Sequence, residues 1–303
     1  MKVLVLYGGL SSERAVSLRS GAEVVAALKA KGHEVLEHDT QTEATVPILT
    51  SADVVFIALH GEGGEDGFYQ KKLEALHVPF VGSGSQASEF CMDKWAYKEW
   101  LTANHYPHPY GELVDSVSFW HSDLITRPFV LKTRGGGSSV DMLLVRDASV
   151  QPDANVVGDL FSRHPEMLLE RLIEGIEITA GILGYRALPI IEIVPPANGE
   201  FDYENKYNGA SQELCPPVNV SPEIQLQAQE MALAIHNATG CRDISRTDML
   251  IDAGGQLNVL ETNTIPGFTK ESTFPKAVVA SGTSMPDFVS LMVDSASART
   301  SLL

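Results

Sequence analysis

The segment RTDMLIDAGGQLNVLETN, residues 246–263, constrains the fold of this chain more tightly than any other. Gly254-Gly255 is flanked by apolar runs, which is typical of a β-hairpin with a two-residue loop. If these glycines form the loop, Asp248 lies opposite Glu261 and Arg246 lies opposite Asn263. The turn therefore predicts which polar side chains meet across the two strands.

An Asp–Glu pair at this position indicates a cation, because like charges that face each other across a strand pair are destabilising. Glu261 and Asn263 are two residues apart and project from the same face. Two carboxylates and one amide oxygen on that face suit a hard ion such as Mg²⁺ that also holds substrate phosphates. The alternative is a hairpin whose charges are solvated. The apolar residues between the charges make the ribbon a poor solvent-exposed element.

Composition limits the classes of function that remain. A chain of 303 residues exceeds the usual single core, so we expect two or three domains. A net charge of −17 argues against a general binder of nucleic acid or anionic membranes. Any phosphate site must then be local, built from particular lysines and backbone amides. Three widely spaced cysteines give neither a zinc pattern nor a disulfide framework, which fits a reducing cytoplasm, and we expect no signal peptide or membrane span.

Residues 1–83 alternate between strand and helix patterns. Strands are predicted over residues 3–7, 33–39 and 52–61, with a further short strand over 79–84. Helices are predicted up to about residue 31, with Ser11 or Ser12 as the cap and Gly32 after the end, and over 66–76. This order predicts an α/β fold with a doubly wound parallel layer, whose sites form at the carboxyl ends of strands. The loops GGLSSER (8–14) and HGEGGEDG (60–67) both lie at such ends. Only the second has a composition, three glycines with a histidine and three acids, that is unusual for a turn with a purely structural role.

The middle of the chain contains a glycine-rich loop. After a helix predicted around residues 92–101, RPFVLKTRGGGSSVDMLLV (127–145) reads as two strands flanking that loop. Backbone N–H groups of such a loop can bind phosphate oxygens, although the sequence is not a Walker A motif. A flexible linker is the alternative, and the apolar residues that bracket the loop argue against it. The N–H groups in question belong to Gly135, Gly136, Gly137 and Ser138.

The last part of the chain adds a long polar segment, residues 198–217, whose length indicates a lid or binding loop. A helix over 221–238 precedes the hairpin, NTIPGFTKES (263–272) follows it, and a final packing helix is predicted over about 285–295. Of the histidines, His60 is the one that lies inside a motif.

Eight segments in order resemble the D-alanine–D-alanine ligase family, ATP-grasp enzymes of peptidoglycan precursor synthesis. The resemblance implies a three-domain ATP-grasp fold: an N-terminal Rossmann-like substrate domain (1–83), a central domain with the glycine-rich loop (84–169) and a C-terminal domain with the lid and metal site (170–303). ATP would lie between the last two. The segments are GGLSSERAVSLRSG (8–21), HGEGGEDGFYQ (60–70), VGSGSQASEFCMDK (81–94), KTRGGGSS (132–139), LLERLIEGIEIT (168–179), DYENKY (202–207), RTDM (246–249) and ETNTIPGFTKES (261–272).

The resemblance also implies a nucleotide site and a metal site. Lysines and loop residues would contact the phosphates, the strand after them would border the adenine, and a later glutamate would bind the ribose. Mg²⁺, for which Mn²⁺ can substitute, would be held by the hairpin carboxylates and amide. In this sequence the phosphate residues are Lys94, Lys132, Gly136, Gly137 and Ser139, the base and ribose residues are Glu170, Arg171, Leu172 and Glu177, and the metal ligands are Asp248, Glu261 and Asn263.

For the two D-alanine substrates the resemblance implies a second set of residues. Glu13 would bind the first amino group, with His60 near the first carboxylate, and Lys206 and Ser272 would bind the second carboxylate. Ser138 and Tyr207 would link the lid to Glu13, while Arg246 and the N–H of Gly267 would stabilise the tetrahedral oxyanion. The family also implies a homodimer in the cytoplasm.

The implied reaction begins with phosphorylation of a carboxylate by ATP, because a free carboxylate is a poor acyl donor. Metal ions and lysines neutralise the charge on the phosphoryl oxygens. The second amine then attacks the acyl phosphate, and closure of residues 200–214 would keep water away.

The sequence departs from the family pattern at four positions: Ala15, Thr133, Asp141 and Arg171 stand where Glu, Pro, Gly and Lys are common. Asp141 either repels the ATP phosphates or occupies a position that needs positive φ. Alternatives to D-alanine as second substrate are D-lactate or D-serine, and a cyclising natural-product ligase shares the fold. The Lys206-Tyr207 pair favours D-alanine. A non-catalytic nucleotide-binding domain is disfavoured because all three metal ligands are present.

Overall fold

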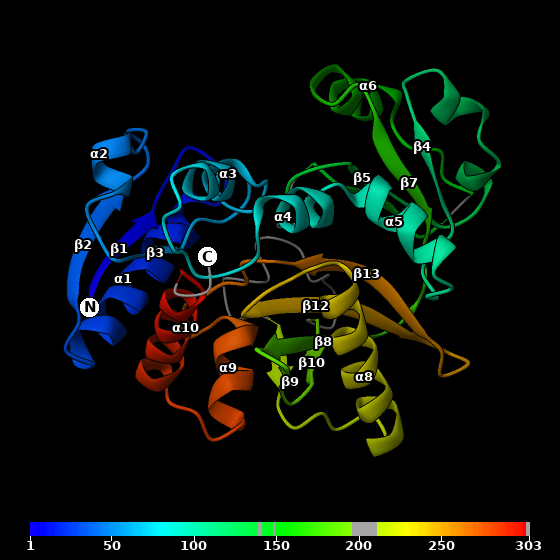
Figure 1. Ribbon diagram of the computed structural model, residues 1–303. Coiled ribbons are helices and arrows are strands. Elements are labelled where there is room, and N and C mark those ends of the chain that lie inside the picture. The colour runs from blue at the N-terminus through cyan, green and yellow to red at the C-terminus, as the bar shows by residue number, and fades with distance from the viewer. Residues whose placement is uncertain (138–140, 148, 196–210, 301–303) are drawn as a thin grey trace.

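The computed structural model describes residues 1–137, 141–147, 149–195 and 211–300, and the statements below concern these residues. Three sheets organise them, one parallel and two antiparallel, and Figure 1 shows the two antiparallel sheets as separate layers. No helix in the described part of the chain is long and apolar enough to cross a membrane.

The N-terminal sheet is parallel, as the sequence predicts, and its strand order is β2-β1-β3. Its strands are β1 (Lys2–Tyr7), β2 (Glu34–Asp39) and β3 (Val54–Ile57), and its helices are α1 (Arg14–Ala30), α2 (Val46–Leu49) and α3 (Phe68–Ala75). Two details differ from the prediction. Glu13, not a serine, is the N-cap of α1, and residues 79–84 make one bridge at Phe80 instead of a strand. Gly82, with φ of 101°, turns the chain away directly after that bridge.

The second sheet is antiparallel, in the order β4-β7-β5-β6. It comprises β4 (Gly111–Val114), β5 (Phe129–Thr133), β6 (Leu143–Val145) and β7 (Met167–Arg171), with η1 (Ser118–His121), η2 (Asp123–Thr126) and α6 (Ala154–Arg163). The single helix predicted around 92–101 is two helices, α4 (Ser85–Met92) and α5 (Lys94–Ala103). Asp93 separates them, because its extended backbone ends α4 while its carboxylate accepts the N–H groups of Trp95 and Ala96 at the start of α5.

The third and largest sheet is antiparallel and has the path β11-β10-β8-β12-β13, with β9 paired to β8. Its strands are β8 (Gly175–Leu183), β9 (Arg186–Ala187), β10 (Ile191–Val194), β11 (Gln212–Leu214), β12 (Ile244–Asp252) and β13 (Leu257–Asn263). The helices of this part are α8 (Pro222–Ala238), α9 (Thr273–Ala280) and α10 (Met285–Thr300). The strand β12 therefore lies inside the sheet, with β8 on one side and β13 on the other.

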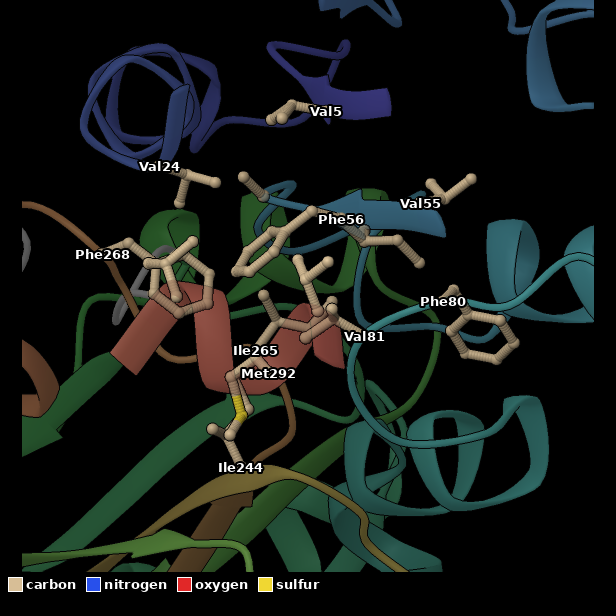
Figure 2. Close-up of a cluster of buried hydrophobic side chains, with 14 of the residues drawn as sticks. Val5, Val24, Val55, Phe56, Phe80, Val81, Ile244, Ile265, Phe268 and Met292 are labelled. Atoms are coloured by element: carbon tan, nitrogen blue, oxygen red, sulfur yellow. The ribbon is translucent and has the colours of Figure 1, made fainter. Parts of the chain in front are cut away.

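The largest apolar core joins residues from the two ends of the chain. Figure 2 shows Phe56 of β3 facing Phe268, with Met292 of α10 below them. The rings of Phe56 and Phe268 are 5.3 Å apart in an edge-to-face arrangement, and both side chains are buried. The final helix therefore packs into the N-terminal layer. The domain boundaries at residues 83 and 169 stay a prediction.

A buried ion pair reinforces this junction. Asp243, whose side chain is 4% exposed, accepts hydrogen bonds from both terminal nitrogens of Arg299 at 2.6 and 2.8 Å and from the N–H of Gly82 at 2.8 Å. Arg299 also donates to the carbonyl of Phe80 at 2.7 Å.

We predict that Arg299→Met lowers the free energy of unfolding by about 2 kcal/mol, because it removes the ion-pair partner of a buried carboxylate, although Arg299 itself is partly exposed. Urea denaturation measures the change. Lys29→Met is the control, because its pair with Glu37 is exposed and its loss should cost no more than about 0.5 kcal/mol. Equal small effects in both variants would contradict this account of the junction.

Candidate active site

The hairpin brings Asp248 opposite Glu261 and Arg246 opposite Asn263, as the sequence predicts. The turn itself differs from the prediction. Asp252 N donates to the carbonyl of Gln256 and Gly255 N donates to the carbonyl of Asp252, so the loop has three residues, with Gly255 at φ of 82°. A register shift between Asp248 and Met249 then restores the pairing beyond it. The extra loop residue and the bulge cancel, which is why the simple turn predicted the correct pair.

Asp248 is held from three sides. Its carboxylate accepts the hydroxyl of Thr179 at 2.7 Å, two guanidinium N–H groups of Arg246 at 2.8 and 2.7 Å, and the amide nitrogen of Asn263 at 3.1 Å. Thr179 lies on β8 directly beside it, and Asn263 on β13. The nitrogen of the Asn263 amide faces Asp248, which leaves its oxygen available as a ligand.

Lys94 connects Glu261 to the glycine-rich loop. Its Nζ lies 3.7 Å from Oε2 of Glu261 and donates to the carbonyl of Gly136 at 2.5 Å. The backbone N–H of Lys94 donates to the carbonyl of Arg134, so side chain and main chain both touch the loop. The sequence reasoning missed Arg134, which makes a two-point contact of 2.9 and 2.7 Å with Asp93. That contact fixes the start of α5, where Lys94 lies.

A cavity of about 430 Å³ lies between the second and third sheets. Most of the predicted nucleotide residues line it, together with both hairpin carboxylates. They are Lys94, Lys132, Gly136, Gly137, Glu170, Arg171, Leu172, Glu177, Asp248 and Glu261. The structure therefore brings together residues that are up to 167 positions apart in sequence, from Lys94 to Glu261.

A smaller cavity, about 80 Å³, adjoins the first and shares Gly137, Asp248 and Glu261 with it. The other predicted residues that the structure describes line this second cavity: Glu13, His60, Arg246, Asn263, Gly267 and Ser272. Four predicted residues, Ser138, Ser139, Lys206 and Tyr207, lie outside the described part of the chain.

Glu13 reaches the glycine-rich loop from the N-terminal layer. A Cβ added to Gly137 would lie 3.1 Å from its Oε2, and a Cβ added to Gly61 would lie 2.7 Å from the same atom. Ser272 is packed in the same manner against Gly267, where an added Cβ would meet its Oγ at 2.6 Å. All three glycines thus leave room for the close approach of a polar side chain, and Gly61, with φ of 68°, also has a backbone conformation that favours glycine.

His60 is buried, and both of its ring nitrogens have partners. Nδ1 lies 3.2 Å from the carbonyl of Ile265, which can only accept, so Nδ1 carries the proton and Nε2 accepts the hydroxyl of Ser20 at 2.8 Å. Ser20 in turn accepts the N–H of Phe268 at 3.1 Å. Burial lowers the pKa of His60, which keeps the ring neutral. This network positions residues 265–268. Ser20 lies inside the segment 8–21, but it was not singled out as a functional residue from the sequence.

Glu65 is a second residue that sequence reasoning missed. It lines the smaller cavity and accepts the N–H groups of Gly61 at 3.0 Å and Ile265 at 3.2 Å. Burial, with a further contribution from the nearby charge of Glu13, raises the pKa of Glu65 to about 8. The segment HGEGGEDG contains three acids, and its spacing alone does not tell which one faces inward.

Asp141 occupies a position with φ of 55°, which confirms one of the two alternatives for this departure from the family. Its carboxylate lies 2.7 Å from Nε2 of His164 and forms an ion pair with Arg163, both at the end of α6. Hydrogen bonding to His164 and then to Arg163 lowers the pKa of Asp141 despite partial burial. Its charge is therefore neutralised by groups at the end of α6.

The comparisons with known proteins agree with this geometry. The family descriptions "D-ala D-ala ligase C-terminus" and "D-ala D-ala ligase N-terminus" match residues 116–294 and 36–83. A D-alanine–D-alanine ligase of Desulforudis audaxviator is 41% identical over 98% of this chain and 99% of the relative.

Solved structures give the same result. The D-alanine–D-alanine ligase of Bacillus anthracis superposes with a TM-score of 0.84 at 31% identity, covering 99% of this chain and 98% of that one. Its complex with ATP gives 0.82 at 30% identity, covering 99% and 97%. The VanG D-Ala:D-Ser ligase of Enterococcus faecalis gives 0.81 at 25% identity, covering 97% and 98%. The fold is that of the ATP-grasp ligases. The chain belongs to the D-alanine–D-alanine ligase family.

We predict that Asp141→Gly changes the free energy of unfolding by less than about 1 kcal/mol, because relief of the positive φ offsets the loss of a partly exposed ion pair. ATP affinity should be unchanged or slightly higher. Asp141→Ala is the matched variant, since it loses the ion pair and keeps the strained backbone, and it should be less stable than Asp141→Gly. Thermal denaturation and ATP titration measure both. A large loss of ATP affinity in Asp141→Gly alone would show a role for the carboxylate in the site.

Proposed function

We propose that this protein joins two D-alanine molecules at the expense of ATP, through an acyl phosphate, to give D-alanyl-D-alanine, ADP and phosphate. The observation that carries the proposal is the junction of the two cavities at Asp248, Glu261 and Gly137. A nucleotide in the larger cavity would present its terminal phosphate at that junction. A substrate carboxylate in the smaller cavity would meet it there, as in-line phosphoryl transfer requires.

The residues at the junction fit a magnesium site. Mg²⁺ is usually bound by one or two carboxylates with substrate phosphates and water as its other ligands. Asp248 and Glu261 provide the carboxylates and Asn263 an amide oxygen. No cluster of three or more His, Cys, Asp or Glu side chains suited to a metal occurs in the described ranges. Substrate phosphates and water would supply the other ligands. The ion, with Mn²⁺ as a substitute, would neutralise charge on the phosphoryl oxygens.

The smaller cavity supplies the groups for the two amino acids. Glu13 can pair with the first amino group, and Ser272, at the start of α9, can bind the second carboxylate. The N–H of Gly267 and the guanidinium of Arg246 can stabilise the oxyanion that forms when the second amine attacks. The Ser20–His60 network holds the backbone around Gly267 in place for this role.

The identity of the second substrate rests on residues outside the described ranges. The D-Ala:D-Ser ligase has the same fold, so the fold does not separate D-alanine from D-serine or D-lactate. Lys206 and Tyr207 support D-alanine by resemblance to the peptide-forming members. The homodimer and the cytoplasmic location likewise stay predictions.

The test of this function is phosphate release from ATP with D-alanine as the only amino acid, followed by the mass of the product. We expect stoichiometric phosphate and dipeptide, and dipeptide should still dominate when equal D-lactate is added at about pH 8, where a larger share of the amine is unprotonated. Phosphate without a D-alanine-containing product would contradict ligation. A dominant ester at that pH would assign the chain to the depsipeptide-forming ligases.

We predict that Glu261→Gln lowers kcat by about 100-fold or more while leaving the fold intact, because the loss falls on charge neutralisation at the transferring phosphoryl group. Steady-state phosphate release measures kcat, and circular dichroism checks the fold. Glu99→Gln removes an exposed carboxylate from α5 and serves as the control. Wild-type turnover in Glu261→Gln would remove Glu261 from the metal site.

A further inference from the structure

Three buried charges form a cluster behind the nucleotide cavity, and the function proposed above leaves one of them without a role. Nζ of Lys98, on α5, lies 2.5 Å from Oε1 of Glu170, on β7. Nζ of Lys132, on β5, lies 2.6 Å from Oε2 of the same carboxylate. The exposed fractions of the three side chains are 7% for Lys98, 5% for Glu170 and 16% for Lys132. Glu170 and Lys132 line the cavity, whereas Lys98 stands behind them.

The two lysines keep Glu170 ionised. Burial alone would raise the pKa of Glu170, but the charges of Lys132 and Lys98 outweigh burial and the net shift is downward. Two lysines share one carboxylate. Burial lowers the pKa of Lys98, and the charge of Glu170 opposes that shift. Lys132 is the more accessible of the two and is the lysine that can turn toward the nucleotide phosphates. When it does so, Lys98 is the cation that stays with Glu170.

Lys98 also supports the wall of the cavity beside Glu170. Its Nζ donates to the carbonyl of Pro109 at 2.5 Å, and Pro109 lines the cavity. Apolar side chains surround this region, in contrast to the charged junction with Asp248 and Glu261. They are Val130, Met142, Leu144, Leu172 and Ile173, a lining suited to the faces of a planar base. The Glu170 carboxylate is the buried charged acceptor within that lining.

We propose that Lys98 is a positioning residue for selection of the nucleobase: it holds Glu170 as an ionised acceptor that favours a purine with a 6-amino group over one with a 6-keto group. The inference rests on the proposed use of ATP. An ionised carboxylate only accepts hydrogen bonds, and Oε1 of Glu170, although ion-paired with Lys98, has no hydrogen-bond partner among the described residues. The 6-amino group of adenine donates, whereas the 6-carbonyl of hypoxanthine is an acceptor that the carboxylate repels.

Without Lys98, the buried carboxylate would have to retain Lys132 or take up a proton when the nucleotide binds. In the first case Lys132 is unavailable to the phosphates, and both nucleotides bind more weakly to the same extent. In the second case the protonated Glu170 can donate to a 6-carbonyl, and discrimination against inosine triphosphate falls. Only the second consequence reduces the preference for ATP, because the penalty against the wrong base depends on a charged acceptor without a donor.

The test is equilibrium binding of ATP and of inosine triphosphate by calorimetry without D-alanine, so that it does not depend on ligation. We expect the wild-type protein to bind ATP at least about tenfold more tightly than inosine triphosphate. Lys98→Met and Lys98→Gln should each reduce this ratio by about tenfold, whereas Lys98→Arg, which keeps the charge, should retain most of it. Lys71→Met, which removes an exposed lysine from α3, should leave the ratio unchanged.

A Lys98→Met or Lys98→Gln protein that unfolds at the wild-type temperature and keeps the wild-type ratio would overturn the proposal. Equal weakening of both nucleotides would do the same, since it would mean that Lys98 supports the fold or releases Lys132 for the phosphates without selecting the base. If one variant does not fold, the other carries the test. A wild-type protein without preference between the nucleotides also overturns it. Normal nucleotide selection in a protein that makes no dipeptide would instead reject the ligase function and leave the role of Lys98 in place.

Discussion

The carboxylate of Asp248, fixed in the interior of the largest sheet, is the interaction on which the arrangement of the site depends. It lies on β12, between β8 and β13, and each of these three strands contributes one of its partners: Thr179, Arg246 and Asn263. A negative charge at this depth is stable only when its hydrogen bonds are satisfied and a cation is close. The guanidinium of Arg246 meets that requirement. The same sheet geometry turns Asp248 and Glu261 toward the point where both cavities meet.

Local charge, more than net charge, determines what this acidic protein can bind. With a net charge of −17 the chain as a whole repels polyphosphates, yet both lysines of the cavity are held in place by acceptors. Lys94 is held by Gly136 and Glu261, and Lys132 by Glu170. Lys94 is thereby ordered before a nucleotide arrives, and the ordering of its side chain is not an additional entropic cost of binding. Lys132 is held beside the cavity by Glu170 until it turns toward the phosphates.

The sequence predicted what depends on local periodicity and on turns. The parallel N-terminal layer, the strands that flank the glycine-rich loop, the helix before the hairpin and the Asp248–Glu261 pair were all accessible in this way. The three-residue turn was not accessible in this way. It is compatible with the Asp248–Glu261 pair only because of the bulge near Met249, and that bulge depends on how β13 packs and has no signature in the sequence of the turn. The break at Asp93 was missed for a related reason: its capping role appears only once the backbone turns there.

Local sequence patterns could not predict the contacts between distant segments. The approach of Glu13 to Gly137, the Ser20–His60–Phe268 network and the burial of α10 against the N-terminal layer join residues far apart in sequence. The resemblance to a family indicated that Glu13 and His60 share a site, but not that both ring nitrogens of His60 would be occupied. Lys98 had no signature at all, since a lysine on a helix is usually solvated. Its ion pair with Glu170 on β7 identifies it as part of the site.

The central claim is that Asp248 and Glu261 share a divalent ion at the junction of the two cavities. The most direct measurement is a crystal structure with Mn²⁺ and a non-hydrolysable ATP analogue, with the metal located by anomalous scattering. The account predicts a peak within about 2.5 Å of an oxygen of each carboxylate and of the terminal phosphates. A peak that contacts the phosphates but neither carboxylate, or no metal at the junction with the nucleotide bound, would contradict it.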